Sequence, residues 1–315
     1  MSHPRLGRRA LLGAVASLGV AAPAIASPPR RNVVLMVGAP AGSAVDRVAR
    51  SIVPFLARHW QRVALTVENL HGGGGVEAAR EVAESPEGQP VLGFVTTPGL
   101  LARCIQSADQ GLPDRLAWFG PITDEPLLLA ARAGQGTVSL VSAATPGDRL
   151  IGCGPAGSAS HLAALQIAEA LDGVRALPFA SAVAAARAAA AGHVAAAVLS
   201  AAELRRAARP DLLPAAIATS ARLPDHAGVP TLTERGIPLV ASVQRGLVAR
   251  PGFPGAGRLS AAIRAVREDP EFQAWAEETG ARPGTGDPAD WLRTLGAERS
   301  ALAARWSRSP WTAGG

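Results

Sequence analysis

Three loops of small residues are the parts of this sequence best suited to chemistry. Gly42-Ser43, Gly72–Gly75 and Gly157–Ser160 each follow a short apolar run and precede a helical pattern. A helix that begins at such a loop offers backbone N–H groups without partners and a partial positive charge. This arrangement binds anions without a lysine or an arginine. One loop of this kind is ordinary turn chemistry, but three on one pattern favour a polar cleft.

The elements that must position these loops alternate between short apolar runs and longer helical stretches, which is the pattern of an α/β protein. In open α/β sheets, ligands bind at the carboxyl ends of the strands, where these loops lie. The expected strands are 32–37, 63–67, 91–95, 118–122, 127–131, 150–152, 174–179, 194–199, 212–219 and 239–248. The expected helices are 44–59, 76–83, 158–171, 182–191, 259–268, 270–279 and 288–305.

Composition limits the class of protein. The chain has 315 residues, which is enough for two domains of roughly 150 residues each. All 31 basic residues are arginines scattered among acids, and the formal net charge is +6. We therefore expect no nucleic-acid partner. The six histidines are dispersed and there is no CxxC motif, so neither a metal site nor a cofactor is predicted. Cys104 and Cys153 are better explained as two unpaired core residues than as a disulfide, although the sequence leaves their pairing open.

The N-terminus has the pattern of an export signal. Arg5, Arg8 and Arg9 precede an uncharged run over 10–22, which is too short to span a membrane. Ala24–Ala26 supplies small residues for a signal peptidase, so residues 1–26 are predicted to be a signal peptide, of the twin-arginine type because Arg8 and Arg9 are adjacent. Cleavage removes three arginines and no acid, which lowers the net charge from +6 to +3. We expect a soluble, periplasmic, monomeric protein.

Several segments, in order along the chain, resemble one known family. Pro40–Arg50 looks like a first ligand loop and helix that usually reads PAGGSTDxxAR. Val67–Asn69 with the following glycines is similar to VEN-x-x-G-A-G-G, and Gly157–Leu162 to GSxxHL. Arg222–Gly236 is similar to R-x-P…V-P-T-x-x-E-x-G. Weaker matches lie at Pro178-Phe179, Gly192–Val194 and Gly246–Pro251. The chain thus resembles the substrate-binding proteins of tripartite tricarboxylate transporters, also called the Bordetella-uptake-gene receptors.

The resemblance implies an α/β fold of the type II periplasmic-binding-protein kind, in which two α/β domains close over a ligand about a hinge. It places domain 1 at residues 27–125 plus 246–315 and domain 2 at residues 126–245. In the family, two loops grip a carboxylate with backbone N–H groups and short hydroxyls, often with ordered water. The predicted ligand-binding residues are Gly42, Ser43, Ala44, Asp46, Thr96, Thr97, Gly157, Ser158, Ala159, Ser160, His161 and Phe179.

Departures from the family pattern bear on the ligand. Ser43 replaces a glycine, Ala44-Val45 replaces Ser-Thr, and Pro155 replaces the first glycine of the loop before the second-domain helix. Phe179 replaces a tyrosine, and Ala195 replaces an aspartate. Because these changes remove polar groups, we predict a monocarboxylate or a partly apolar ligand rather than a tricarboxylate.

Two predicted site residues have competing interpretations. Asp46 either orients an amine of the ligand or simply occupies the first turn of its helix, where an acid is favourable. His161 has no visible partner, and a local bond at the helix start is favoured over contact with the ligand.

Other functions remain in competition with uptake. The liganded receptor could contact a sensor kinase instead of membrane transporter subunits, and no sequence motif separates the two partners. Gly152–Gly157 formally reads G-x-G-x-x-G, as in a cofactor-dependent oxidoreductase. However, Asp172 precedes the next expected strand instead of ending it, and Pro155 lacks an N–H for the phosphate turn. A receptor that is not an enzyme is therefore the favoured interpretation.

Overall fold

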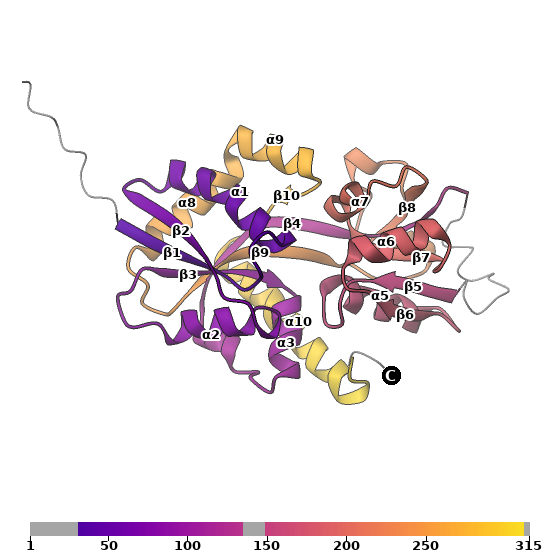
Figure 1. Cartoon of the computed structure of the whole chain (residues 1–315), viewed down its shortest axis with the longest axis horizontal. Helices are drawn as coiled ribbons and strands as arrows, with labels where there is room; N and C mark the ends of the chain where they lie inside the picture. Colours follow the sequence, from indigo (N-terminus) through magenta and orange to yellow (C-terminus); the bar gives the residue numbers. More distant parts are fainter. Residues whose placement is uncertain (1–30, 135–148, 312–315) are drawn as a thin grey trace, which may run out of the picture.

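In the computed structural model, which describes residues 31–134 and 149–311, two sheets share one long strand, β4. The first half of β4 pairs with β9, and from Leu127 onward it pairs with β7 and β8. Figure 1 shows the first sheet on the left and the second on the right, with β4 and β9 crossing between them. The predicted α/β architecture is confirmed. The strands are β1 (Arg31–Val37), β2 (Val63–Asn69), β3 (Val91–Thr97), β4 (Ala117–Arg132), β5 (Leu150–Cys153), β6 (Arg175–Pro178), β7 (Ala196–Ser200), β8 (Leu212–Ile217), β9 (Ser242–Ala249) and β10 (Arg282–Pro283).

Helices cover both faces of the first sheet, whose strand order is β2-β1-β3-β9-β4. Alternate residues of β1 are buried, and Val33 and Leu35 pack with Ile52 of α1 in one core cluster. Each fully buried side chain of this size contributes about 1.5–3 kcal/mol. A second cluster, on the opposite face, joins α2, α3 and α10. The helices are α1 (Ala44–His59), α2 (Val76–Glu84), α3 (Gly99–Gln106), α5 (Ala159–Ala170), α6 (Ala182–Ala191), α7 (Ala201–Ala207), α8 (Ala256–Glu268), α9 (Pro270–Thr279) and α10 (Pro288–Arg308).

The second sheet, β6-β5-β7-β4 with β8 beyond, is also covered on both faces. Its core on the α5 side joins residues such as Ile151 and Ile167, and its core on the opposite side contains the inward alanines of α6. Ala185, Ala186 and Ala189 are fully buried, and their small side chains let α6 lie close to the sheet.

Serine caps fix where four helices begin. Each cap residue has extended backbone angles, and its hydroxyl accepts from the N–H three residues later. A cap of this type sets the first free N–H groups of the helix at a defined position. The four caps are Ser43 of α1, Ser158 of α5, Ser181 of α6 and Ser200 of α7.

The structure departs from the sequence-based elements in a few places. Helices α3 and α7 were not predicted, and β4 is one continuous strand where two were expected. Helix α8 begins at Ala256, three residues before the predicted start, because Gly255 takes a left-handed conformation that starts the turn. The pairing of β4 changes at Leu127, and β9 begins at Ser242. The domain boundaries proposed from the sequence stay predictions.

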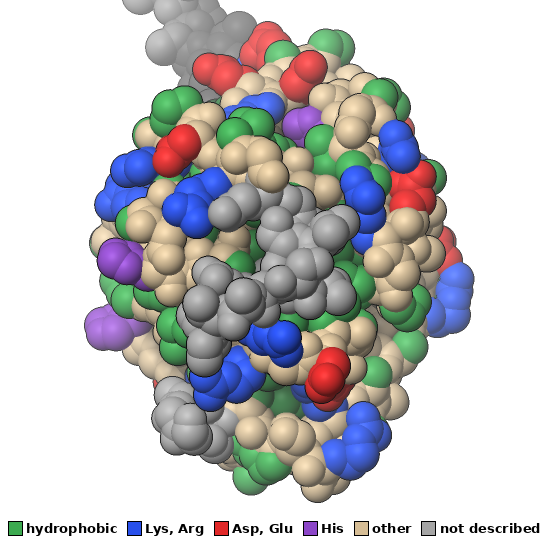
Figure 2. Space-filling model, turned by 90° about the vertical axis from the view of Figure 1, so that its right-hand side faces the viewer, with side chains coloured by type: hydrophobic (Ala, Val, Ile, Leu, Met, Phe, Trp, Pro, Cys, Tyr) green, Lys and Arg blue, Asp and Glu red, His purple; other side chains and the backbone are tan. Residues whose placement is uncertain are grey.

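The predicted signal peptide, residues 1–26, lies outside the described residues. Within the described part, every helix is too short or too polar to cross a bilayer. On the face that Figure 2 shows, arginines and acidic side chains are interspersed.

Candidate ligand-binding cleft

A cavity of about 450 Å³ lies between the two sheets, at the carboxyl ends of the strands. Its walls come from the loops that follow β1, β2 and β3 on one side, and from the loop after β5 and helix α7 on the other. Residues of β9 also line it. This is the position at which ligands bind in open α/β sheets.

The N-terminus of α1 forms part of the first wall. Ala44 and Val45 occupy the first two helical positions and line the cavity. Their N–H groups have no acceptor within the helix, and no loop acceptor among the described residues takes them. The wall therefore presents two free donors and the positive end of a helix dipole.

Asp46 holds this loop in place from beneath. It is 2% exposed, accepts from the Gly42 N–H at 2.8 Å and forms an ion pair with Arg50 at 3.0 Å. Asn69 donates to it at 2.9 Å and also donates to the carbonyl of Ala39. The hydrogen bonds from Arg50 and Asn69 lower the pKa of Asp46 to about 2 despite its burial. Of the two interpretations of Asp46, the structure supports the first-turn acid, because its oxygens are taken by protein donors.

The N-terminus of α5 forms the opposite wall in the same way. The Ser158 hydroxyl caps the helix by accepting from the His161 N–H, which leaves the N–H groups of Ala159 and Ser160 without an acceptor among the described residues. The Ser160 hydroxyl accepts from the Gly154 N–H at 3.0 Å, so it braces the loop. The N-terminus of one helix packed on each sheet, α1 on the first and α5 on the second, thus faces the same cavity.

His161 is a structural residue of this loop. It is 3% exposed, and its Nδ1 accepts from the Gly157 N–H at 3.0 Å. Burial, followed by the charges of Arg305 and Arg103, lowers the pKa of His161 to about 4. The neutral imidazole is therefore the form present at neutral pH, and the interpretation as a local helix-start bond is supported.

The structure brings half of the predicted residues together at the cavity, and the other half do not line it. Gly42 and Ser43 build the start of α1, Asp46 and His161 brace the two loops, and Thr97 is buried. Phe179 packs in the core beside α6. The predicted residues that line the cavity are Ala44, Thr96, Gly157, Ser158, Ala159 and Ser160.

Four polar residues of the wall were missed by sequence reasoning: His71, Arg103, Glu203 and Arg245. Arg103 lies on α3 and donates to the carbonyl of Ala156, so it links the first wall to the second. Glu203 forms a capping box at the start of α7, where it accepts from the Ser200 N–H at 2.9 Å. Arg103 and Glu203 belong to two helices that the periodicity analysis did not find.

Arg245 forms a buried ion pair with Glu125 at the place where β4 and β9 cross between the sheets. The two side chains are 7% and 2% exposed, and Arg245 Nη1 donates to Glu125 Oε1. A charge this deeply buried requires a partner, since water cannot solvate it. The pair was not predicted because its members are far apart in sequence.

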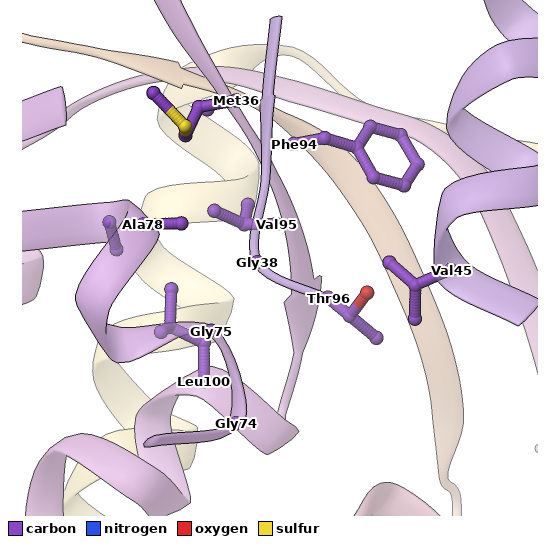
Figure 3. A pocket seen from close by; sticks show the side chains of 12 residues that line it. Met36, Gly38, Val45, Gly74, Gly75, Ala78, Phe94, Val95, Thr96 and Leu100 are labelled. Carbon is purple, nitrogen blue, oxygen red and sulfur yellow. The ribbon is translucent and has the colours of Figure 1, made fainter. Parts of the chain in front are cut away.

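A smaller apolar pocket of about 70 Å³ adjoins the cavity and shares Val45, Thr96 and Leu100 with its wall. Figure 3 shows the Thr96 side chain pointing toward Val45, with Phe94 further along β3. The close-up therefore places a hydroxyl at the edge of an otherwise apolar recess.

Two other kinds of site considered from the sequence are a metal site and a dinucleotide site. No group of three His, Cys, Asp or Glu side chains among the described residues could hold a metal ion. For the dinucleotide motif, Asp172 is exposed and precedes β6 instead of ending it. Cys104 and Cys153 are free and buried in different core clusters, which agrees with their interpretation as unpaired core residues.

Comparison with known proteins agrees with this geometry. No family model and no curated protein matches the chain. A TctC solute-binding protein from Polaromonas is 23% identical, with a TM-score of 0.74 over 90% of this chain and 100% of that chain. The periplasmic binding protein BugD is 20% identical, with a TM-score of 0.71 over 90% and 99%. The chain has the two-domain fold of the TctC and BugD periplasmic binding proteins. MatC from Rhodopseudomonas palustris, solved with bound malate, is 25% identical, with a TM-score of 0.69 over 87% and 98%. The resemblance drawn from the sequence motifs is confirmed in the fold.

Proposed function

We propose that this protein is an extracytoplasmic receptor that captures a small carboxylate in the cavity between its two sheets. The observation that carries the proposal is the pair of helix N-termini, α1 and α5, that face each other across about 450 Å³. Their free N–H groups at Ala44, Val45, Ala159 and Ser160 suit a group with several acceptor sites, and a carboxylate has about four.

The energetics favour an anion over a neutral ligand at this point. A hydrogen bond to a charged group contributes about 1.5–3 kcal/mol, roughly twice the value for a neutral pair. Each helix N-terminus adds a partial charge of about +0.5 that favours the anionic form. Because the donors are backbone groups on rigid helices, they are oriented before the ligand arrives.

The fold supports a transport role. The TctC protein is a solute-binding protein, and MatC holds malate, so a carboxylate receptor is known on this architecture. We propose that the chain is exported by its N-terminal signal and delivers its ligand to a transporter of the tripartite tricarboxylate type. The crossing strands β4 and β9 would act as the hinge, with domain 2 at residues 126–245.

Contacts on both sides of the crossing strands would set the closed position. Arg103 of α3 reaches the loop before α5. Arg305 of α10 pairs with Glu169 of α5 at 2.8 Å. Arg205 of α7 donates to carbonyls at the end of α9 at 2.6 Å. These contacts join the two domains around the cavity.

Thermal unfolding against a carboxylate panel tests this function. The protein, residues 27–315, is unfolded and refolded first to remove any carried-over ligand. A ligand at 100 times its dissociation constant adds about 2.7 kcal/mol, which raises the Tm of a chain of this size by roughly 4 °C. We expect a shift with one carboxylate class. No shift with any carboxylate, together with a shift from a nicotinamide or flavin nucleotide, would refute the receptor and support the oxidoreductase.

A further inference from the structure

Arg245 lies on the floor of the cavity, on the same sheet face as the core under α1. Alternation along β9 puts Arg245 on one face with Leu247 and Ala249, which pack in that core. The residue of β3 directly opposite Arg245 is Thr96, which also lines the cavity. Directly opposed residues of antiparallel strands share a face, so the floor carries a threonine and an arginine side by side.

Both of these side chains keep polar atoms without a protein partner. Arg245 Nε and Thr96 Oγ1 are buried and make no hydrogen bond with the described residues. Arg245 as a whole is 6% exposed. Oε2 of Glu125 and Oγ1 of Thr123, the β4 neighbour of Arg245, are likewise buried without a partner among the described residues. Buried polar groups are normally paired, so these unpaired atoms beside a ligand cavity indicate a place for a polar group of the ligand, with Nε of Arg245 and Oγ1 of Thr96 as donors to its acceptor atom.

The charge of Arg245 is already balanced by Glu125, whose carboxylate takes Nη1. The other charged groups of the wall balance as well, since Arg103 carries +1 and Glu203 carries −1. Asp46, behind the first wall, is paired with Arg50. The excess positive potential is therefore that of the two helix N-termini, about +0.5 each. That excess matches one carboxylate. A second carboxylate on the floor would lie close to Glu125, and the residues that line this cavity offer no further cation to balance it.

We propose that Arg245 and Thr96 form a second subsite for a neutral hydrogen-bond acceptor, so that the ligand is a monocarboxylate that also carries a carbonyl or hydroxyl oxygen. This inference rests on the proposed function, because the helix N-termini must hold the carboxylate. Glu125 sets the specificity, since it cancels the charge of Arg245 while leaving Nε free to donate.

Isosteric ligands separate charge from shape at this subsite. Binding of glutarate, its monoamide and pentanoate is measured by titration calorimetry, and the same three-way comparison is made for succinate. The monoamide has the shape of the dicarboxylate but one charge fewer. One of the two monoamides should bind more tightly than the other. We expect the wild-type protein to bind that monoamide at least tenfold more tightly than the dicarboxylate of the same chain length, and at least tenfold more tightly than the unsubstituted acid of the same chain length.

Two variants test the roles of the pair. Glu125→Gln keeps the shape and an acceptor for Arg245 but removes the negative charge, so the preference should move at least tenfold toward the dicarboxylate. Replacing both members (Arg245→Met with Glu125→Leu) avoids an unpaired buried charge and should abolish the preference for the monoamide over the unsubstituted acid. Glu268→Gln makes the same charge change as Glu125→Gln on an exposed residue outside the cavity wall and should leave the ratios unchanged.

The outcomes are distinguishable. Equal or tighter binding of the dicarboxylate by the wild-type protein overturns the neutral subsite while leaving the carboxylate receptor in place. Equal binding of monoamide and unsubstituted acid does the same. A failure of every carboxylate tested here and in the wider panel refutes the receptor itself, and this inference with it.

Discussion

Removal of one backbone N–H at the start of α5 gives the sharpest test of how the cleft holds its ligand. Ala159 is the first helical residue, and its N–H has no acceptor among the described residues. Proline at this position has no N–H to donate, yet its fixed φ fits the first turn of a helix. The residue before it, Ser158, already has φ −73° and ψ 160°, which a following proline requires. The substitution Ala159→Pro should therefore remove a donor and leave the fold intact.

The magnitude follows from the bond that is lost. A hydrogen bond to a charged acceptor contributes about 1.5–3 kcal/mol, so the dissociation constant should rise roughly 10- to 150-fold. Titration calorimetry on the refolded protein measures it, with the carboxylate that gives the largest thermal shift. Ala44→Pro makes the same deletion at α1, where Ser43 has φ −67° and ψ 169°, and should weaken binding by a similar factor.

A matched control is available in α6. Ala182 is the first residue of that helix, follows an extended serine cap at Ser181 and is 3% exposed. It does not line the cavity, so Ala182→Pro should bind the ligand with wild-type affinity. If Ala44→Pro and Ala159→Pro also kept wild-type affinity, the anion site at the helix N-termini would be refuted.

Three further predictions concern the loops and cores that support the cleft. Burial lowers the pKa of His161 from its ordinary 6.5 to about 4. The contribution of the neutral imidazole to the unfolding free energy is complete above pH 6.5 and declines as the pH falls, by on the order of 2 kcal/mol at pH 5. In urea unfolding, the difference in unfolding free energy between pH 7 and pH 5 should therefore be smaller in His161→Gln than in wild type. The substitution Asp46→Asn removes the charge that pairs with Arg50, and we expect it to lower the unfolding free energy at pH 7 by about 1–3 kcal/mol. Because the pKa of Asp46 is lowered to about 2, this difference between variant and wild type should vanish as the pH falls from about 4 to 2. A difference that stays constant with pH would contradict the ion pair. Burial raises the pKa of Cys104 and of Cys153 to about 12. Neither thiol should therefore react with a maleimide in the native protein at pH 8, whereas both should react after unfolding. Labelling of either cysteine in the native state would show that the core cluster around it opens.

The sequence was informative wherever local chemistry decides the structure. A small-residue loop before an apolar helical pattern located the starts of α1 and α5, because caps and helix spacing act over a few residues. The same local chemistry gives two of the predicted serines a structural role that the sequence analysis did not assign to them. Ser43 and Ser158 lie three residues before an N–H that each of them caps, so those hydroxyls hold the helices that present the backbone donors. A polar residue at a cap position is better assigned to its own helix first.

Thr96 on the floor of the cleft was predicted, but the charged pair beside it could not be found in this way, because it depends on pairing between distant strands. Arg245 and Glu125 lie on strands whose register is set only when the second domain has returned the chain to the first sheet. One signal was present: Arg245 occupies an inward position in β9, where Leu247 and Ala249 are buried. A charged residue in phase with buried ones needs a buried counter-charge. Its phase in the strand predicts that such a partner exists, but only the topology identifies it.

The two parts of the cleft therefore differ in how they recognise a ligand. Under the proposed function, the backbone donors at the two helix starts would bind any carboxylate of suitable size, because they interact with its charge and not with the rest of the molecule. Discrimination must come from side chains beyond them, and on the floor these are Thr96 and Arg245 with its partner Glu125. An arginine whose charge is already neutralised favours a ligand with a neutral oxygen at this point over a ligand with a second negative charge. Because the backbone donors do not depend on side chains, the loss of polar side chains from the loops would leave the proposed carboxylate site intact, and the choice of ligand would then depend on this buried pair.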